Sequence, residues 1–417
     1  MKHSFWLSIA LGAGWLLSPE SLVIAGNSAG NMGWLAIPAL AAVALLFALT
    51  GNLIKQSLAT ENSSDFLLLS SLTGTIPAIC LTIVSCLPFV TLAATALLVS
   101  SGYTFNEVFL YWFPNFGFSF LLLGLLSILQ AFPEKIILRA QIIFVLLAAG
   151  GLFLLTVVGI AGAEQPGNAL LQKPEKVSAA SSALLLLLFT GSRLSGGSKQ
   201  SFLIPAIAFV LFSFWMFASL SYVNPERLGS STIPYMTAAR KIMGDPGRQI
   251  MGLIIISGTS AAITGLLIMC RSMLGAITLS PNTKSLFSVK KQRYLLPPLV
   301  ALATGILMAR GLAGDDLLEI LLHGALILWL IHHSLLALSA VILIQKRTGH
   351  MPIAGALSTA ILIGGVLFLI TTSPQRTETI RFITSMLGAG GLLAAIWYLL
   401  HKKLTPEPTT QQTEKSL

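Results

Sequence analysis

Charged residues are scarce in this sequence: Asp, Glu, Lys and Arg make up only 10% of its 417 residues. A soluble globular protein carries about 25% charged residues, so a water-soluble fold of this length would have too few charges to cover its surface. The scarcity excludes a soluble enzyme, and the 55% of hydrophobic residues excludes a disordered chain. The apolar runs are long and continuous rather than short and alternating, which argues against a transmembrane barrel. The composition predicts an all-α integral membrane protein.

Cysteine is equally scarce, with only Cys80, Cys86 and Cys270. All three lie inside apolar runs, and their spacing does not suit a metal site. We therefore expect small buried core residues and no disulfide framework.

Twelve apolar segments are each long enough to cross a bilayer, which takes about 20 mostly apolar residues. The predicted spans are 5–27, 32–56, 77–101, 113–131, 135–162, 176–194, 201–222, 249–279, 294–313, 317–345, 352–372 and 379–402. With both termini cytoplasmic, sixteen of the 25 basic and five of the 15 acidic residues fall on the cytoplasmic side, giving a net charge of +11 there and −1 opposite. This asymmetry follows the positive-inside rule. The net charge of +10 therefore indicates how the protein is oriented in the lipid bilayer, and it is not a sign of nucleic-acid binding. We predict a multi-pass protein of the cell (inner or plasma) membrane.

Helix-breaking residues interrupt the first span, where Gly12 and Gly14 are followed by Pro19. Irregular backbone is tolerated inside a bilayer only where it is buried or lines a cavity. A break near the two glycines would free backbone N–H groups and create the N-terminus of a second half-helix, which favours a carboxylate. The alternative is that the glycines only allow close helix packing. The same interruptions argue against a signal peptide over residues 1–25.

The sixth span has a second candidate break at Phe189-Thr190-Gly191. Carbonyl groups freed there would accept hydrogen bonds from an ammonium group. Broken helices in corresponding positions of two halves mark the binding site of secondary transporters. Breaks in spans one and six therefore predict a transporter.

Several motifs together resemble the amino acid–polyamine–organocation (APC) superfamily. Its first helix carries Gly-Ser-Gly-Ile-Phe before a proline, and this chain has Gly12-Ala13-Gly14-Trp15-Leu16 before Pro19. Its sixth helix carries Phe-x-Gly-Phe-Glu, of which Phe189-Thr190-Gly191 matches, while Ser192-Arg193 replaces the last pair. The segment Cys270-Arg271-Ser272-Met273-Leu274 is similar to the end of the family's eighth helix.

The resemblance implies a leucine-transporter-type fold of twelve transmembrane helices, a 5+5 inverted repeat plus two helices, with helices 1 and 6 broken. The two repeats would occupy residues 1–162 and 163–345, and the two further helices residues 346–404. Residues 405–417 are polar and predict a disordered cytoplasmic tail.

The resemblance also implies the roles of the two breaks. The amides of Ala13, Gly14 and Trp15 would hold a substrate carboxylate. Residues Phe189 to Gly191, with Thr190 between them, would hold its amino group, and Phe189 would also be a gate.

Two residue pairs are candidates for coupling transport to an ion. Thr259 and Ser260, beside Gly258, are similar to a sodium site between helices one and eight of this fold, and hydroxyls with freed carbonyls suit Na⁺. The alternative is that both hydroxyls bond back to their own helix.

His332 and His333 lie mid-span, where ionisable residues are functional candidates, and histidine titrates near neutrality. The alternative is a neutral histidine hydrogen-bonded in the bundle. No cofactor besides H⁺ or Na⁺ is implied.

Glu20 follows Pro19 at the start of the outer half-helix, where it is either a partner of the helix dipole or part of an outer gate. The other expected lining residues are apolar, among them Trp15, Phe214 and Trp215. The low charge favours a neutral, apolar amino acid as the substrate.

The leading hypothesis is a secondary active transporter of neutral, apolar L-amino acids by alternating access, coupled to H⁺ or Na⁺. The alternatives are an exporter or exchanger of related amines, and a non-transporting or regulatory subunit on the same scaffold. A transporter of the major facilitator type would carry a basic, glycine-rich motif between helices two and three, and segment 57–76 lacks it. A membrane-embedded enzyme would need clustered His, Asp or Glu, and the His332-His333 pair has no acidic partner within the spans, so we expect no enzyme.

Overall fold

The computed structural model describes residues 5–61, 64–162, 179–190, 198–278, 289–312, 316–373 and 375–404. Every regular element in these ranges is a helix. The helices of the first half are α1 (Phe5–Leu16), α2 (Pro19–Met32), the 3-10 helix η1 (Gly33–Leu35), α3 (Ala36–Glu61), α4 (Asp65–Thr73), α5 (Thr75–Val108), α6 (Asn115–Ala131) and α7 (Glu134–Ala161). Those of the second half are α9 (Ala179–Leu188), α10 (Ser198–Tyr222), α11 (Pro225–Ser230), α12 (Pro234–Thr278), α13 (Val289–Ala309), α14 (Asp316–Thr348), α15 (Ile353–Thr372) and α16 (Arg376–Leu404). Gly191 and the predicted tail over 405–417 lie outside the described residues.

Each of the twelve predicted spans contains a helix among its described residues, but that all twelve cross a membrane stays a prediction. Eight helical segments of the described chain are long and apolar enough to cross a membrane, namely α2 with α3, α5, α7, α10, α12, α14, α15 and α16. Shorter apolar helices occur at α6 and in α13. The all-helical class and the multi-pass membrane character are confirmed, whereas the inverted repeat and its domain bounds stay predictions.

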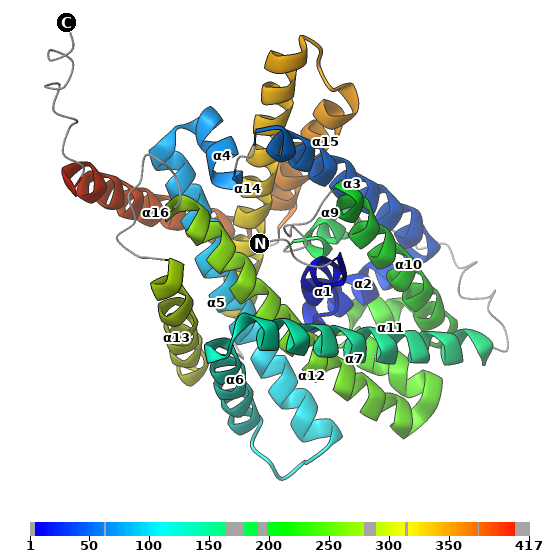
Figure 1. The fold of residues 1–417 in the computed structure, drawn as a ribbon. Coiled ribbons are helices and arrows are strands. Elements are labelled where there is room, and N and C mark those ends of the chain that lie inside the picture. The colour runs from blue at the N-terminus through cyan, green and yellow to red at the C-terminus, as the bar shows by residue number, and fades with distance from the viewer. Residues whose placement is uncertain are drawn as a thin grey trace, which may run out of the picture.

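The bundle has a buried centre and a periphery that presents apolar side chains outward. In their apolar stretches most residues of α12, α14 and α5 are buried, whereas only a minority of those of α15, α16 and α7 are buried. Figure 1 shows α1 and α2 in the middle of the fold, with α13, α15 and α16 at its edge. α12 packs along α7, α5 and α1, and so connects the periphery to the centre.

α12 contains a kink at Gly244, whose φ of +65° lies in the left-handed region. Glycine adopts this conformation without steric penalty. Pro246 follows two residues later and has no backbone N–H to continue the helix ladder. The kink separates the first turns of α12 from its long membrane segment.

Two of the three cysteines meet between the central helices. Cys86 of α5 and Cys270 of α12 are buried, and their Sγ atoms lie 2.7 Å apart. Cys80, one and a half turns earlier on α5, has its Sγ 3.5 Å from the carbonyl oxygen of Leu387 on α16 instead. The expectation of buried core cysteines is confirmed, but no local pattern predicts that two of them are neighbours.

We expect mild oxidation to join Cys86 to Cys270, because their sulfur atoms are already adjacent. Each thiol loses a proton, and two electrons pass to an added oxidant such as diamide. Peptide mapping by mass spectrometry under non-reducing conditions should show this one cross-link, with Cys80 still free to be alkylated after denaturation. The Cys86→Ser variant should show no cross-link. A cross-link from Cys80 would contradict the packing of α5 against α12.

Candidate functional site

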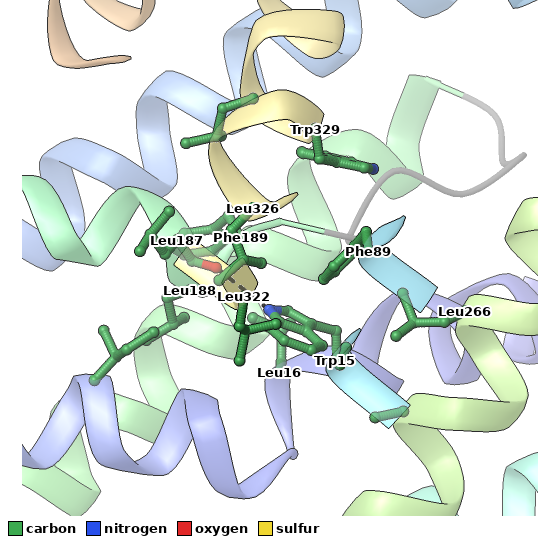
Figure 2. Packing of buried hydrophobic residues seen from close by; sticks show 14 of the residues in the cluster. Trp15, Leu16, Phe89, Leu187, Leu188, Phe189, Leu266, Leu322, Leu326 and Trp329 are labelled. Atoms are coloured by element: carbon green, nitrogen blue, oxygen red, sulfur yellow. Dashed lines mark hydrogen bonds between the residues drawn. The ribbon is translucent and has the colours of Figure 1, made fainter. Parts of the chain in front are cut away.

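The ends of two helices meet inside the bundle. α1 ends at Leu16 and α9 ends at Leu188, and both ends are buried. The indole Nε1–H of Trp15 donates a hydrogen bond to the backbone carbonyl of Leu187, with an N–O distance of 3.3 Å (Figure 2). Trp15 and Leu187 are 172 residues apart in sequence. Their hydrogen bond therefore joins the end of α1 directly to the end of α9 in the sixth predicted span.

The first break lies at Leu17 and Ser18. Ser18 has extended backbone angles and precedes Pro19, the first residue of α2. Proline disfavours helical geometry in the preceding residue and has no N–H of its own, so the helix stops there. The Oγ of Ser18 accepts from the Ser21 N–H at 3.3 Å, and the Oγ of Ser21 donates to the Trp15 carbonyl at 2.8 Å. Two serines thus satisfy backbone groups that the break would otherwise leave bare.

The predicted position of this break, near Gly12 and Gly14, is wrong. Both glycines lie within α1, and so do Ala13 and Trp15. In a regular helix the ordinary partner of an amide is the carbonyl four residues earlier, so these amides are less suited to a carboxylate than the start of α2. Pro19, five residues beyond Gly14 and three beyond the last residue of α1, determines where the helix stops.

The glycines of α1 serve close packing, which was the alternative interpretation. A Cβ on Gly14 would lie 2.8 Å from the carbonyl oxygen of Ala261 and 2.9 Å from Nε2 of Gln141. The Nε2 group of Gln141 donates to the carbonyl of Ala10 at 3.1 Å. α1 is therefore held tightly against both α12 and α7.

α9 ends at Leu188, where the second break is expected, and the break itself stays a prediction because residues 191–197 lie outside the described residues. The Thr190 Oγ1 donates to the carbonyl of Leu187 at 2.7 Å, and the Thr190 N–H donates to the same oxygen at 3.2 Å. Phe189 and Thr190 are both fully buried. The structure thus places two of the three predicted residues of this break beside Trp15, and the third, Gly191, lies outside the described residues.

Aromatic rings cover the two breaks. Phe189 stacks on Phe47 of α3 with ring centroids 5.4 Å apart, Phe47 stacks on His333 at 5.4 Å, and His333 stacks on Trp329 at 5.3 Å. Trp15 packs edge-on against Phe89 of α5 at 5.0 Å. Figure 2 shows Trp15, Phe89, Phe189 and Trp329 around the junction of the half-helices. The predicted gate residue Phe189 is thus one ring of a stack that leads to His333.

The predicted sodium ligands point in two directions. Thr259 accepts a hydrogen bond from Ser101 of α5 at 2.7 Å and donates to the carbonyl of Leu97 at 3.3 Å. Ser260 donates back to the carbonyl of Ile256 in its own helix at 2.8 Å. Back-bonding to the same helix, the alternative reading, therefore holds for Ser260 but not for Thr259.

Gly258, the neighbour of this pair, is the residue of α12 that touches the first break. A Cβ built on Gly258 would overlap the carbonyl oxygen of Leu17. Only a residue without a side chain lets α12 approach the broken backbone this closely. Gly258, noted from sequence only as the neighbour of Thr259 and Ser260, is thus required for close packing of α12 against the first break.

The two histidines of α14 also diverge. The Nε2 atom of His333 lies 3.3 Å from Oγ1 of Thr50 on α3, at the end of the aromatic stack. His332 instead lines a cavity of about 200 Å³ together with Lys55 and Asp65. Both imidazoles are almost fully buried. The structure therefore brings His333 to the helix breaks and places His332 in a separate polar environment.

Glu20 lies half-buried in the first turn of α2, directly after the first break. Its electrostatic neighbours are Glu319 and His323 of α14, and Tyr235 of α12 interacts with it as well. A carboxylate at this end of a helix is favourable to the helix dipole. Its role in a gate stays a prediction.

The expectation for α10 is wrong at one position. Trp215 is buried, but Phe214 is 53% exposed and faces away from the bundle. Successive helix residues point about 100° apart, so both could not face one site. Phe214 is therefore not a lining residue.

Metal-binding side chains do not gather in the part of the chain that the structure describes. There, no group of three or more His, Cys, Asp or Glu residues could hold a metal ion. The groups at the breaks are hydroxyls, an indole and backbone carbonyls. Such a set suits the polar ends of an organic molecule better than a divalent cation, which binds most strongly to carboxylate, imidazole or thiolate.

Sequence reasoning missed Ser18, Ser21, Thr50 and Gln141. Ser18 carried a usable signal, because serine directly before proline is a common helix start. Thr50 and Gln141 carried none, because their partners lie far away in sequence.

Comparison with known proteins gives a fold but no family. No protein-family model matches the chain, and no curated protein sequence matches it. Solved structures of the manganese transporter of Eremococcus coleocola are similar: two variants each have a TM-score of 0.59 at 13% identity, covering 97% of both chains. The same transporter in complex with an aromatic bis-isothiourea substituted compound has a TM-score of 0.55 at 12% identity, again covering 97% of both chains. The chain therefore has a membrane-transporter fold.

We expect Gly258→Ala to destabilise the protein, because the added methyl group would collide with the Leu17 carbonyl at the first break. Overpacking of this kind costs about 1–3 kcal/mol. Thermal unfolding in detergent should show a lower Tm for this variant. The matched control is Gly150→Ala in α7, where an added Cβ meets nothing within 4 Å, and it should leave Tm unchanged or slightly higher. Equal Tm values for the two variants would contradict the close approach of α12.

Proposed function

We propose that this protein is a secondary active transporter of neutral, apolar L-amino acids, working by alternating access between the two helix breaks. The observation that carries the proposal is the hydrogen bond between Trp15 and Leu187, which brings the ends of the half-helices together in a buried position. The transporter fold and the resemblance of both breaks to the APC superfamily support it. The membrane orientation proposed with it has both termini in the cytoplasm.

The two breaks offer ends of opposite polarity. α2 begins at Pro19, and the N-terminus of a helix carries partial positive charge that favours a carboxylate. α9 ends at Leu188, and its last carbonyls carry partial negative charge that favours an ammonium group. An amino acid zwitterion would find a complementary end for each of its charged groups.

The surroundings of the breaks suit an apolar side chain. Phe47, Phe89, Phe189 and Trp329 are all buried around the junction. A charged substrate side chain would lose its hydration there without gaining a partner charge. A neutral, apolar amino acid meets this constraint at the lowest cost.

The described structure is closed at this junction, because the chain's own groups occupy the polar ends. The carbonyl of Leu187 already accepts from Trp15 and Thr190, and the carbonyl of Trp15 accepts from Ser21. In the proposed cycle, opening separates Trp15 from Leu187 and the substrate takes over the polar groups that are released. The exchange keeps buried backbone groups satisfied throughout.

A second candidate, transport of a divalent metal ion, is favoured by the fold of the manganese transporter. The residues at the breaks argue against it. Ser18 and Ser21 supply neutral hydroxyls at the first break, and Thr190 supplies another at the second. Neutral hydroxyls alone would not replace the hydration shell of Mn²⁺.

Uptake by purified protein in liposomes tests the proposal. We expect accumulation of radiolabelled neutral amino acids such as leucine, isoleucine or valine when a proton or sodium gradient is imposed, and little uptake of arginine or glutamate. Empty liposomes provide the background, and a parallel assay with Mn²⁺ and an internal metal-sensitive dye tests the second candidate. Uptake of Mn²⁺ without amino acid uptake would overturn the proposal. Neither flux nor binding across twenty amino acids would favour a non-transporting subunit.

A further inference from the structure

A polar cavity opens on the side of the bundle that the charge asymmetry assigns to the cytoplasm. Its volume is about 200 Å³, and it lies between α3, α4, α5, α12 and α14. Its rim includes the exposed Ser272 and the half-buried Lys55, Ser64 and Asp65, while His332 forms its deeply buried end. The cavity thus leads from the surface to an ionisable side chain.

His332 lies at the midpoint of its helix. It is sixteen residues from either end of α14, or about 24 Å along the helix axis. Charged side chains at such depth are costly unless they serve a function. Histidine is the side chain whose charge changes between pH 5 and 8, so it can bind and release a proton under physiological conditions.

The next residue connects this cavity to the helix breaks. His333 stacks between Phe47 and Trp329, and Phe47 stacks on Phe189 at the second break. A change in the charge of His332 therefore occurs one peptide unit away from the ring stack that closes the junction. This adjacency gives protonation a short route to the gate.

Two charged side chains line the cavity together with His332. Lys55 comes from α3 and Asp65 from α4, whereas α5 contributes Thr82 and α12 contributes Ser272, neither of which is charged. The adjacent Arg271 donates a hydrogen bond to Gln130 on α6. By Coulomb's law, a negative charge on Asp65 and a positive charge on Lys55 act with opposite sign on a charge at His332.

We infer that this cavity is the cytoplasmic access route for the coupling proton and that His332 is the group that binds and releases that proton. The inference rests on the proposed transport function and selects H⁺ over Na⁺ as the driving ion. The placement of the sodium candidates supports the choice, because Thr259 is bonded to α5 and Ser260 to its own helix. His333 is then a positioning residue between His332 and the gate.

The decisive variant is His332→Gln, which keeps a polar side chain of similar size but does not titrate. In liposomes with a pH gradient of one unit, one coupled proton supports about tenfold accumulation of substrate. The variant should lose accumulation above the external concentration but keep exchange of internal for external amino acid, because exchange requires no net proton movement. His350→Gln, at an exposed position two residues beyond the end of α14, is the matched control and should accumulate as the wild type does.

The outcomes separate this inference from the proposed function. A wild type that accumulates amino acid with Na⁺ alone, or a His332→Gln variant that still accumulates, overturns the proton assignment and leaves the transport function standing. A wild type that moves no amino acid overturns both. Loss of accumulation with preserved exchange supports both.

Charge variants at the rim keep the inference testable if His332→Gln does not fold. Asp65→Asn removes the charge that favours protonated His332, so the pH dependence of uptake should shift to lower pH. Lys55→Gln removes the opposing charge and should shift it to higher pH. If the two variants shift the pH dependence in the same direction, or not at all, the assignment is overturned. A purely structural role for the two side chains would not give shifts of opposite direction.

The access route has a test of its own. Ser272→Cys should react with a membrane-impermeant methanethiosulfonate added to the cytoplasmic face of membrane vesicles. Thr264→Cys, fully buried two turns earlier on α12, should not react, and the wild type is the blank because Cys80, Cys86 and Cys270 are buried. Reaction of Ser272→Cys only from the opposite face, or no reaction, overturns the cytoplasmic route.

Discussion

The whole structure depends on satisfying broken backbone inside an apolar bundle. A helix that stops within a bilayer leaves carbonyl and N–H groups that each cost several kcal/mol if they find no partner. Here Ser18 and Ser21 satisfy the first break, Thr190 satisfies the second, and Trp15 bonds one to the other. Two irregular segments far apart in sequence thereby become one polar centre. The arrangement also limits what the centre can recognise, since its groups are neutral and fixed by the backbone.

The remaining helices hold that centre in place by close packing. Gly14 and Gly258 allow α1 and α12 to approach without side chains between them, and Gln141 bonds α7 to α1. These contacts leave little room for α1 to slide against α12. The aromatic stack from Phe189 through Phe47 to His333 lacks such interlocking, because flat rings in contact can slide or rotate. A conformational change at the breaks is therefore expected to pass through the rings rather than through the glycine contacts.

Sequence reasoning performed well where the signal was local and poorly where it was not. All twelve apolar segments contain a helix among the described residues, because a long apolar run needs no distant partner to be recognised. The first break was expected but misplaced, since glycine was given more weight than Pro19, whose ring ends a helix through local sterics alone. Side-chain directions were inaccessible from sequence. The step of about 100° between successive helix residues decides that Trp215 is buried while Phe214 is exposed, and the rotation of α12 decides that Thr259 faces α5. The approach of Cys86 to Cys270 joins residues 184 apart, and no local pattern records it.

The similarity to a manganese transporter concerns the fold, and a shared fold does not determine which substrate is transported. The two chains have similar folds at 13% identity, and a fold accommodates many functions through a few residues at its site. For a divalent ion those residues must supply charge, and within the described part of this chain no cluster of His, Cys, Asp or Glu does so. The charge-poor composition of the sequence therefore extends to the helix breaks, where half-helix ends remain as the source of polarity. In the proposed function, helix ends of opposite sign are complementary to a substrate that carries both charges and has no net charge itself.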